Sequence, residues 1–159
     1  MKRDDRLSNT LHALLHMADH QAATGAPMTS EMLAACLSTN PVVVRRTMAG
    51  LREMGLVTSE RGHGGGWRLA RDLKEVTLLK VAEALGETTL LATPKLVDHE
   101  GCLVEAAVTD ALAEAHAAAN ALLVARLAEV TLADLADDFR RRMAAHPHKG
   151  INHGSPNAS

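Results

Sequence analysis

The sequence predicts a mainly α-helical chain with a small β-wing, that is, a winged helix-turn-helix followed by a long dimerisation helix. Residues 51–71, LREMGLVTSERGHGGGWRLAR, read as a helix end, a stop at Gly55, a strand, a glycine-rich hairpin and a second strand. Asn40-Pro41 opens the preceding helix, because asparagine is a strong N-cap and proline suits the first helical position. Small apolar residues from Val104 to Ala125 recur at alternating steps of four and three, which is a heptad seam.

These signals divide the chain into four parts. We expect a winged helix-turn-helix over residues 1–86, a linker over 87–101, a helical dimerisation arm over 102–145 and a disordered tail over 146–159. The expected helices cover about residues 5–23, 41–54, 78–85, 103–130 and 131–142, with a short helix capped by Thr29 or Ser30. The expected strands cover about residues 56–60 and 66–70.

Apolar periodicity orients the first three helices. On the first helix, the expected inward face carries Leu7, Leu11, Leu14, Leu15 and Ala18. On the second helix it carries Met32, Leu33 and Leu37, and on the third it carries Val44, Met48 and Leu51. Thr77 is the expected cap of the fourth helix, and Thr131 with Asp134 resembles a capping box for the last one.

Composition limits the class of protein. The chain has 159 residues, a net charge of −2 and two cysteines, too few for a disulfide framework, so we expect a cytoplasmic protein. The opening residues do not resemble a signal peptide, and no apolar run is long enough to span a membrane. Residues 38–71 hold six arginines against two glutamates, a net of +4, whereas residues 72–159 hold 8 basic and 13 acidic residues, a net of −5. A basic head on an acidic arm is typical of a DNA-binding protein.

The third helix and the hairpin supply the candidate DNA contacts. Arg45 and Arg46 can read guanine edges or bind phosphates, and Val42 and Val43 can touch thymine methyl groups. The alternatives are a solvated helix face for the arginines and helix packing for the valines. The residues just before this helix are candidate phosphate contacts: Ser38, Thr39 and Asn40. Capping alone also explains Asn40.

The hairpin tip is the second candidate contact. Arg61, His63 and Gly64 lie in a thin segment that can follow a nucleic-acid backbone or enter a minor groove. A solvated hairpin without a ligand is the alternative. Trp67 is expected to anchor this wing in the core rather than to stack on a base.

At this point the residues resemble a known family, the Rrf-type winged-helix transcription regulators, relatives of IscR and NsrR. The resemblance rests on residues 28–71, on EVTLLKVAEALGE and on the late VTLADL, and its most specific part is the RG-x-GGG-aromatic-x-L-A-R wing. The family implies a homodimer, held by crossed long helices, that represses or activates promoters. Cluster-binding members carry three closely spaced cysteines before the long helix, but this chain has only Cys102 there, so we expect no iron–sulfur cluster and no other cofactor.

The two cysteines remain candidate sensors. Cys102 stands at the start of the long helix, where unpaired N–H groups stabilise a thiolate, and is the better candidate. Cys36 precedes the recognition helix and is most simply a small buried hydrophobe, with a redox thiol as the alternative.

The remaining polar patterns give no catalytic site. His12, His16 and His20 recur every fourth residue, which suits metal ligands, but a polar or DNA-facing stripe explains them better, and we predict no metal site. No nucleophile–base, paired-carboxylate or phosphate-loop arrangement stands out, so we expect no enzyme activity.

The sequence therefore favours a sequence-specific transcriptional regulator, expected to be a repressor and to respond to redox state or electrophiles through a cysteine. Its expected partners are a double-stranded DNA operator and a second copy of itself, with an unknown small-molecule effector and no membrane. The expected dimer seam consists of Val104, Val108, Ala111, Ala115, Ala118, Leu122 and Ala125. The alternative is a winged-helix protein-interaction module without a DNA role.

Overall fold

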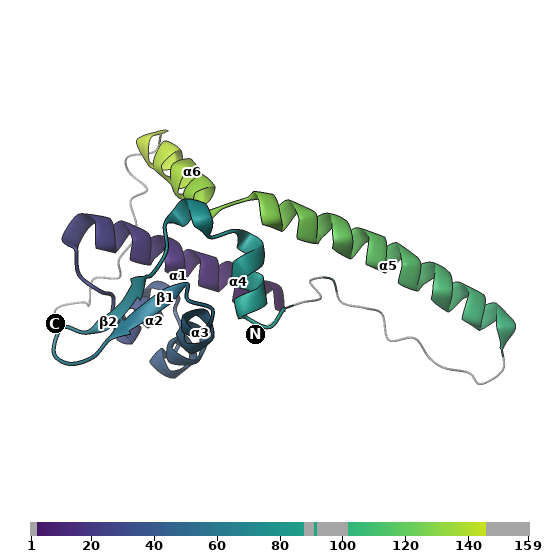
Figure 1. The fold of residues 1–159 in the computed structure, drawn as a ribbon, viewed down its shortest axis with the longest axis horizontal. Coiled ribbons are helices and arrows are strands. Elements are labelled where there is room, and N and C mark those ends of the chain that lie inside the picture. The colour runs from purple at the N-terminus through teal and green to yellow at the C-terminus, as the bar shows by residue number, and fades with distance from the viewer. Residues whose placement is uncertain (1–2, 88–90, 92–101, 146–159) are drawn as a thin grey trace.

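A computed structural model describes residues 3–87, 91 and 102–145, and it is mostly helical with one small sheet (Figure 1). The elements, in chain order, are α1 (Arg3–Thr24), α2 (Ser30–Cys36), α3 (Pro41–Glu53), β1 (Val57–Glu60), β2 (Gly66–Leu69), the 3-10 turn η1 (Leu73–Glu75), α4 (Leu78–Ala84), α5 (Leu103–Glu129) and α6 (Leu132–Ala145). This order confirms the predicted fold class. The predicted linker, apart from Glu87 and Leu91, and the predicted tail lie outside the described residues.

Short polar side chains set the helix starts, as the sequence indicated. Thr29 Oγ1 accepts the Met32 N–H at 3.2 Å, and Asn40 Oδ1 accepts the Val42 N–H at 2.8 Å. Before α6, Asp134 accepts the Thr131 N–H at 2.8 Å and the Asp134 N–H donates back to Thr131 Oγ1 at 3.2 Å. These bonds satisfy N–H groups that have no partner inside the helix.

The core lies among α1, α2, α3, α4, the sheet and the start of α6. The predicted inward residues of α3 are all buried, and so are Ala13, Leu14 and Met17 of α1. The predicted stripe on α1 was only partly right, because Leu7, Leu11, Leu15 and Ala18 are partly buried and Thr10 is buried instead. Helix α1 contacts α2, α4, α6 and β2, so its buried face is wider than one stripe. This face is centred on Ala13, Leu14 and Met17, of which only Leu14 was predicted.

Met32 is a second correction. We expected it to point inward, but it is 39% exposed, whereas Leu33 and Ala34 are buried. Helix α2 is only seven residues long, so its short apolar pattern left the angular position of its buried face poorly fixed.

The wing is an antiparallel hairpin tied to the start of α2. Strands β1 and β2 pair from Val57 with Leu69 to Glu60 with Gly66. Trp67 forms a bridge with Met28, through backbone hydrogen bonds of 2.8 and 3.1 Å, and packs against the core, which confirms its predicted anchoring role. Gly66 is required there, because a Cβ atom would lie 2.5 Å from the Met28 carbonyl oxygen.

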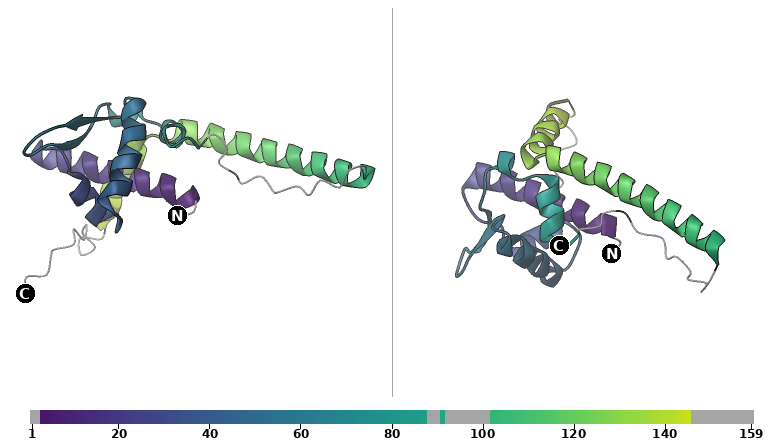
Figure 2. Two further views of the ribbon diagram at one scale, coloured as in Figure 1. Left: turned by 90° about the horizontal axis from the view of Figure 1, so that it is seen from below. Right: turned by 45° about the vertical axis from the view of Figure 1, so that its right-hand side comes forward.

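The long helix α5 projects from this head in all three views (Figures 1 and 2). Its 27 residues span about 40 Å at the usual helical rise. A short β-bridge holds the C-terminal end of α5 against the head. The Leu78 N–H donates to the Val130 carbonyl and the Leu132 N–H donates to the Val76 carbonyl, each at 2.9 Å. Leu132 is fully buried. The end of the arm is therefore joined to the head by both packing and backbone hydrogen bonds.

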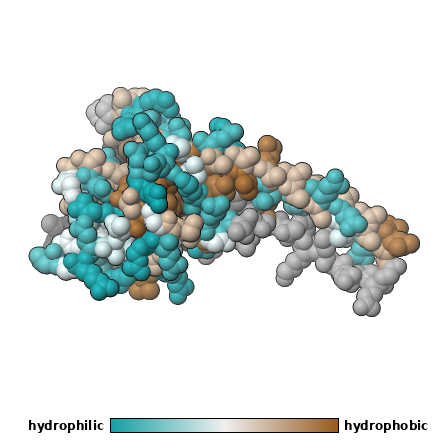
Figure 3. All heavy atoms as spheres, viewed as in Figure 1, coloured by the Kyte–Doolittle hydropathy of each residue, from teal (hydrophilic) through white to brown (hydrophobic). Residues whose placement is uncertain are grey.

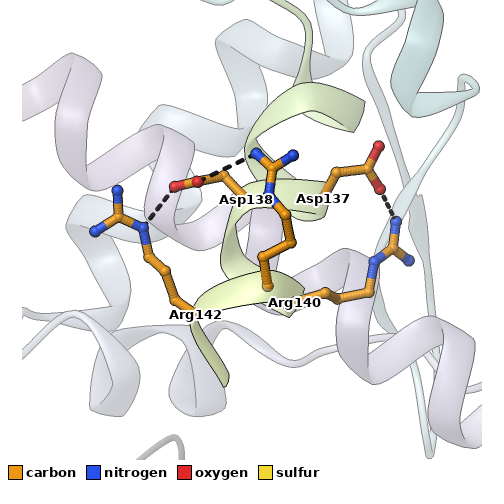
Figure 4. A network of polar contacts seen from close by, with 5 residues as sticks. Asp137, Asp138, Arg140 and Arg142 are labelled. Atoms are coloured by element: carbon orange, nitrogen blue, oxygen red, sulfur yellow. Dashed lines mark hydrogen bonds and ion pairs between the residues drawn. The ribbon is translucent and has the colours of Figure 1, made fainter. Parts of the chain in front are cut away.

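The outer face of α6 carries ion pairs between neighbouring turns (Figure 4). Arg140 pairs with Asp137, while Arg142 Nε donates to Asp138 at 2.6 Å. The Asp138 pKa is lowered, first by its hydrogen bonds from Arg142 and Arg141. Such exposed pairs contribute little to stability, so they mark a solvated helix face.

Among the described residues, no helix combines the length and the apolar character needed to cross a membrane.

Candidate nucleic-acid interface

Helix α3 separates an apolar back from an exposed front. Val44, Met48 and Leu51 face the core, while Val42 is 61% exposed and Val43 is 42% exposed. Arg45 and Arg46 are exposed on the same helix. A recognition helix needs this division, because its back must be held by the core while its front meets base edges and phosphates.

The front of α3 and the wing share one surface hollow of about 520 Å³. Arg45 lines it from α3, and His63 and Gly64 line it from the wing tip. It is also lined by Thr29, Ser30 and Glu31 at the start of α2 and by Trp67 of β2. The fold therefore brings three of the predicted contacts, Arg45 of the helix and His63 and Gly64 of the wing, to one hollow.

A second hollow of about 440 Å³ lies on the exposed side of α3. It is lined by Val42, Val43, Arg46 and Thr47, together with Arg6 from the start of α1. Arg6 is 41% exposed and lies 3.9 Å from the buried carboxylate of Glu87. The oxygen of Glu87 nearest to Arg6, Oε1, has no hydrogen-bond partner among the described residues, so the link to Arg6 is a loose ion pair.

The arginines of the basic head differ in their partners. Arg68 pairs with Glu60 across the wing, Arg71 donates to the Gly55 carbonyl and Arg45 donates to Glu31. Arg46 and Arg61 have no polar partner among the residues that the structure describes. These two guanidinium groups keep all their N–H donors for a ligand.

The turn between α2 and α3 holds Ser38, Thr39 and Asn40, all exposed. Asn40 is occupied by its cap, whereas the Ser38 hydroxyl has no partner in the described part of the chain. Ser38 has a φ of +50°, the left-handed conformation that closes α2. The Ser38 N–H donates to the Ala35 carbonyl at 3.3 Å, and the Thr39 N–H donates to the Ala34 carbonyl at 3.0 Å.

Sequence reasoning missed two residues of this surface. Glu31 lies in the hollow shared by Arg45 and the wing, and Arg6 lies in the hollow beside Arg46. Both come from helices other than α3, and only the packing of those helices brings them to the front. No local pattern in the sequence could have indicated them.

The model of the Rrf2 family, described as an iron-dependent transcriptional regulator, matches residues 3–138. The chain belongs to the Rrf2 family of transcriptional regulators. A comparison with curated proteins gave no match.

Solved structures agree with this Rrf2 assignment. One, provisionally described as a DNA-binding protein, is 29% identical, covers 82% of this chain and 97% of its own, and has a TM-score of 0.62. Another, provisionally described as a transcriptional regulator from Lactobacillus plantarum, is 21% identical over 93% of this chain and 97% of its own, with a TM-score of 0.72. T. potens IscR is 18% identical over 86% of this chain and 87% of its own, with a TM-score of 0.53. The last two similarities show the fold alone.

The iron of the Rrf2 family description does not fit the cysteines of this member. Cys36 is half-buried on α2, whereas Cys102 is exposed at the start of α5, and the sequence has no third cysteine. The described residues contain no group of three histidine, cysteine, aspartate or glutamate side chains placed to hold a metal. The chain cannot supply the three closely spaced cysteines that the resemblance associates with cluster-binding members.

The two thiols differ in environment. Burial raises the pKa of the Cys36 thiol, which disfavours the reactive thiolate. Cys102 is the N-cap residue of α5, and its side chain makes no capping hydrogen bond. Its exposure and position leave the Cys102 sulfur accessible to reagents.

Helix α5 of this Rrf2 protein has no buried residue. All residues of the predicted seam are exposed, with Val104 at 74%, Val108 at 53% and Leu122 at 75%. Figure 3 shows apolar colour along α5 to its far end. Exposed apolar surface of this length is typical of an association surface.

Proposed function

We propose that this protein is a sequence-specific DNA-binding regulator that places the front of α3 in the major groove and the wing against the neighbouring backbone. The observation that carries the proposal is the hollow shared by Arg45, His63 and Gly64. Arg46 lines a second hollow on α3, and neither Arg46 nor Arg61 has a polar partner among the described residues. Guanidinium groups with free donors bind guanine edges and phosphates, and Val42 and Val43 offer methyl groups to thymine.

The proposed assembly is a homodimer through the exposed seam of α5. Val104, Val108 and Leu122 would each contribute about 1–2 kcal/mol on burial, and the alanines between them allow two helices to approach closely. A two-fold dimer presents two α3 helices, so its operator is an inverted repeat with half-sites about one or two helical turns apart.

Repression is the proposed mode of action. A dimer bound to two successive half-sites would block polymerase where the operator overlaps a promoter. Occupancy of such a site would lower transcription in a purified system, and an increase would assign activation instead.

Cys102 is the proposed sensor, with Cys36 as the rival. The Cys102 thiolate would add to a quinone carbon, forming a C–S bond, while the ring takes up a proton and becomes a hydroquinone adduct. Cys102 lies at the end of α5 opposite the one joined to the head (Figure 1), so the adduct would add bulk there, disturb the pairing of the two α5 helices and in that way change the spacing of the two heads. A benzoquinone titration should weaken operator binding by wild type and Cys36→Ser but not by Cys102→Ser. The reverse pattern would assign Cys36, and no response in wild type would exclude both.

The test of DNA recognition is selection of duplexes from a random pool by the full chain. The expected result is enrichment of an inverted repeat, and Arg141→Ala, a change on the solvated face of α6, should enrich the same sequence. A pool that stays random after repeated rounds would contradict the proposal and favour a protein-interaction module.

A further inference from the structure

Glu31 is an acidic residue within the basic surface just described. Its side chain is 63% exposed, and its Oε1 accepts a hydrogen bond from Arg45 Nη2 at 2.6 Å. The pKa of Glu31 lies below its usual value, first because the carboxylate accepts a hydrogen bond from its own backbone N–H at the start of α2, with the Arg45 charge adding to the effect. A full negative charge therefore stands where DNA phosphates would approach.

Stability does not explain this pair. Both side chains are more than half exposed, and exposed ion pairs contribute about 0–1 kcal/mol. The carboxylate also repels phosphate, so it opposes non-specific binding of DNA. Neither stability nor general affinity for DNA explains the pair, which leaves the effect of Glu31 on the position of the Arg45 side chain.

The first turn of α2 contacts both reading elements. Ser30 Oγ accepts the Trp67 Nε1–H at 3.0 Å, which fixes the base of the wing. Glu31, the next residue, holds Arg45 of α3. One turn thus sets the position of the guanidinium relative to the wing.

The chemistry of arginine makes such a hold useful. The guanidinium has five N–H donors in one plane, and Glu31 takes one of them, so two parallel donors remain for guanine O6 and N7. An unrestrained arginine loses more conformational entropy on binding and can turn to a phosphate instead.

From the Glu31–Arg45 contact beside the wing we infer that Glu31 is a positioning residue for base recognition. It holds Arg45 toward a guanine edge and keeps it from the phosphates, and thereby raises the ratio of operator to random-DNA affinity. This inference rests on the proposed function, because it requires that the wild-type chain prefer some sequence.

The experiment compares this ratio in matched variants on the selected operator and on a random duplex. Glu31→Ala should lower the ratio about tenfold, with equal or tighter binding to the random duplex. Glu60→Ala is the control, because it removes the carboxylate that pairs with Arg68 in the wing. It should change binding to both duplexes alike and leave the ratio unchanged.

A double-mutant cycle tests whether Glu31 acts through Arg45. In an Arg45→Ala background, Glu31→Ala should change the ratio no further. An unchanged ratio in Glu31→Ala, or losses that add in the double variant, would overturn the inference while leaving the proposed function intact. Wild type without any sequence preference would instead refute the proposed function itself, and this inference with it.

Discussion

Ser38 occupies a backbone conformation that glycine adopts more easily, so Ser38→Gly should stabilise the protein. Ser38 has a φ of +50°, and the N–H groups of Ser38 and Thr39 donate back to the last turn of α2. The N–H groups of Gly55 and Leu56 donate in the same pattern to the last turn of α3, where Gly55 has a φ of +67°. A left-handed conformation costs an L-residue about 1–2 kcal/mol. Glycine also loses about 0.4–1 kcal/mol more backbone entropy on folding, so the expected net gain is about 0.5–1 kcal/mol.

Urea unfolding at fixed protein concentration measures this gain, because concentration affects the apparent stability of a dimer. Ser38→Ala is the matched control, since it also removes the hydroxyl but keeps a Cβ in the left-handed conformation. Ser38→Gly should be the more stable of the two variants. Both should bind DNA slightly more weakly if the hydroxyl contacts a phosphate. The reasoning is refuted if Ser38→Gly is no more stable than Ser38→Ala.

Three further predictions concern the arm and the family's iron. Replacing Ala111 and Ala118 with Glu puts charges in the α5 seam and should give monomers in sedimentation where wild type is dimeric; an unchanged dimer would rule out this seam. Leu132→Ala should cost about 2–5 kcal/mol in denaturant unfolding, because Leu132 is fully buried, and a cost below about 1 kcal/mol would show that α6 is not part of the core. The chain purified without oxygen should show no charge-transfer absorption in the visible spectrum, and stoichiometric iron with such absorption would overturn this expectation.

Local signals in the sequence predicted the elements well. Asn40-Pro41, Thr77 and the Thr131–Asp134 box each act within three residues, so their hydrogen bonds appear in the structure as expected. The glycine-rich wing was equally readable, because its turn depends on neighbouring residues. The faces of α1 and α2 were less well predicted, since they depend on several elements that pack against them.

The candidate site was only half predictable. The front of α3 and the wing tip follow from periodicity and glycine content, but Glu31 lies 14 residues from Arg45 on another helix. Arg6 likewise reaches the front of α3 only through the packing of α1. On α5 the heptad steps predict a seam, whose residues are exposed in the single chain, and the dimer through this seam stays a prediction.

The central claim, that the front of α3 reads bases while the wing binds the backbone, is tested most directly by Arg46→Ala and Arg61→Ala. Their affinities for the selected operator and for a random duplex should be measured over a range of salt concentrations. Arg46→Ala should weaken the binding free energy for the operator by about 1–3 kcal/mol, and that for the random duplex much less. Arg61→Ala should weaken binding to both duplexes alike. It should also reduce, by about one, the slope of the logarithm of the binding constant against the logarithm of the salt concentration. Unchanged operator affinity in both variants would contradict the account.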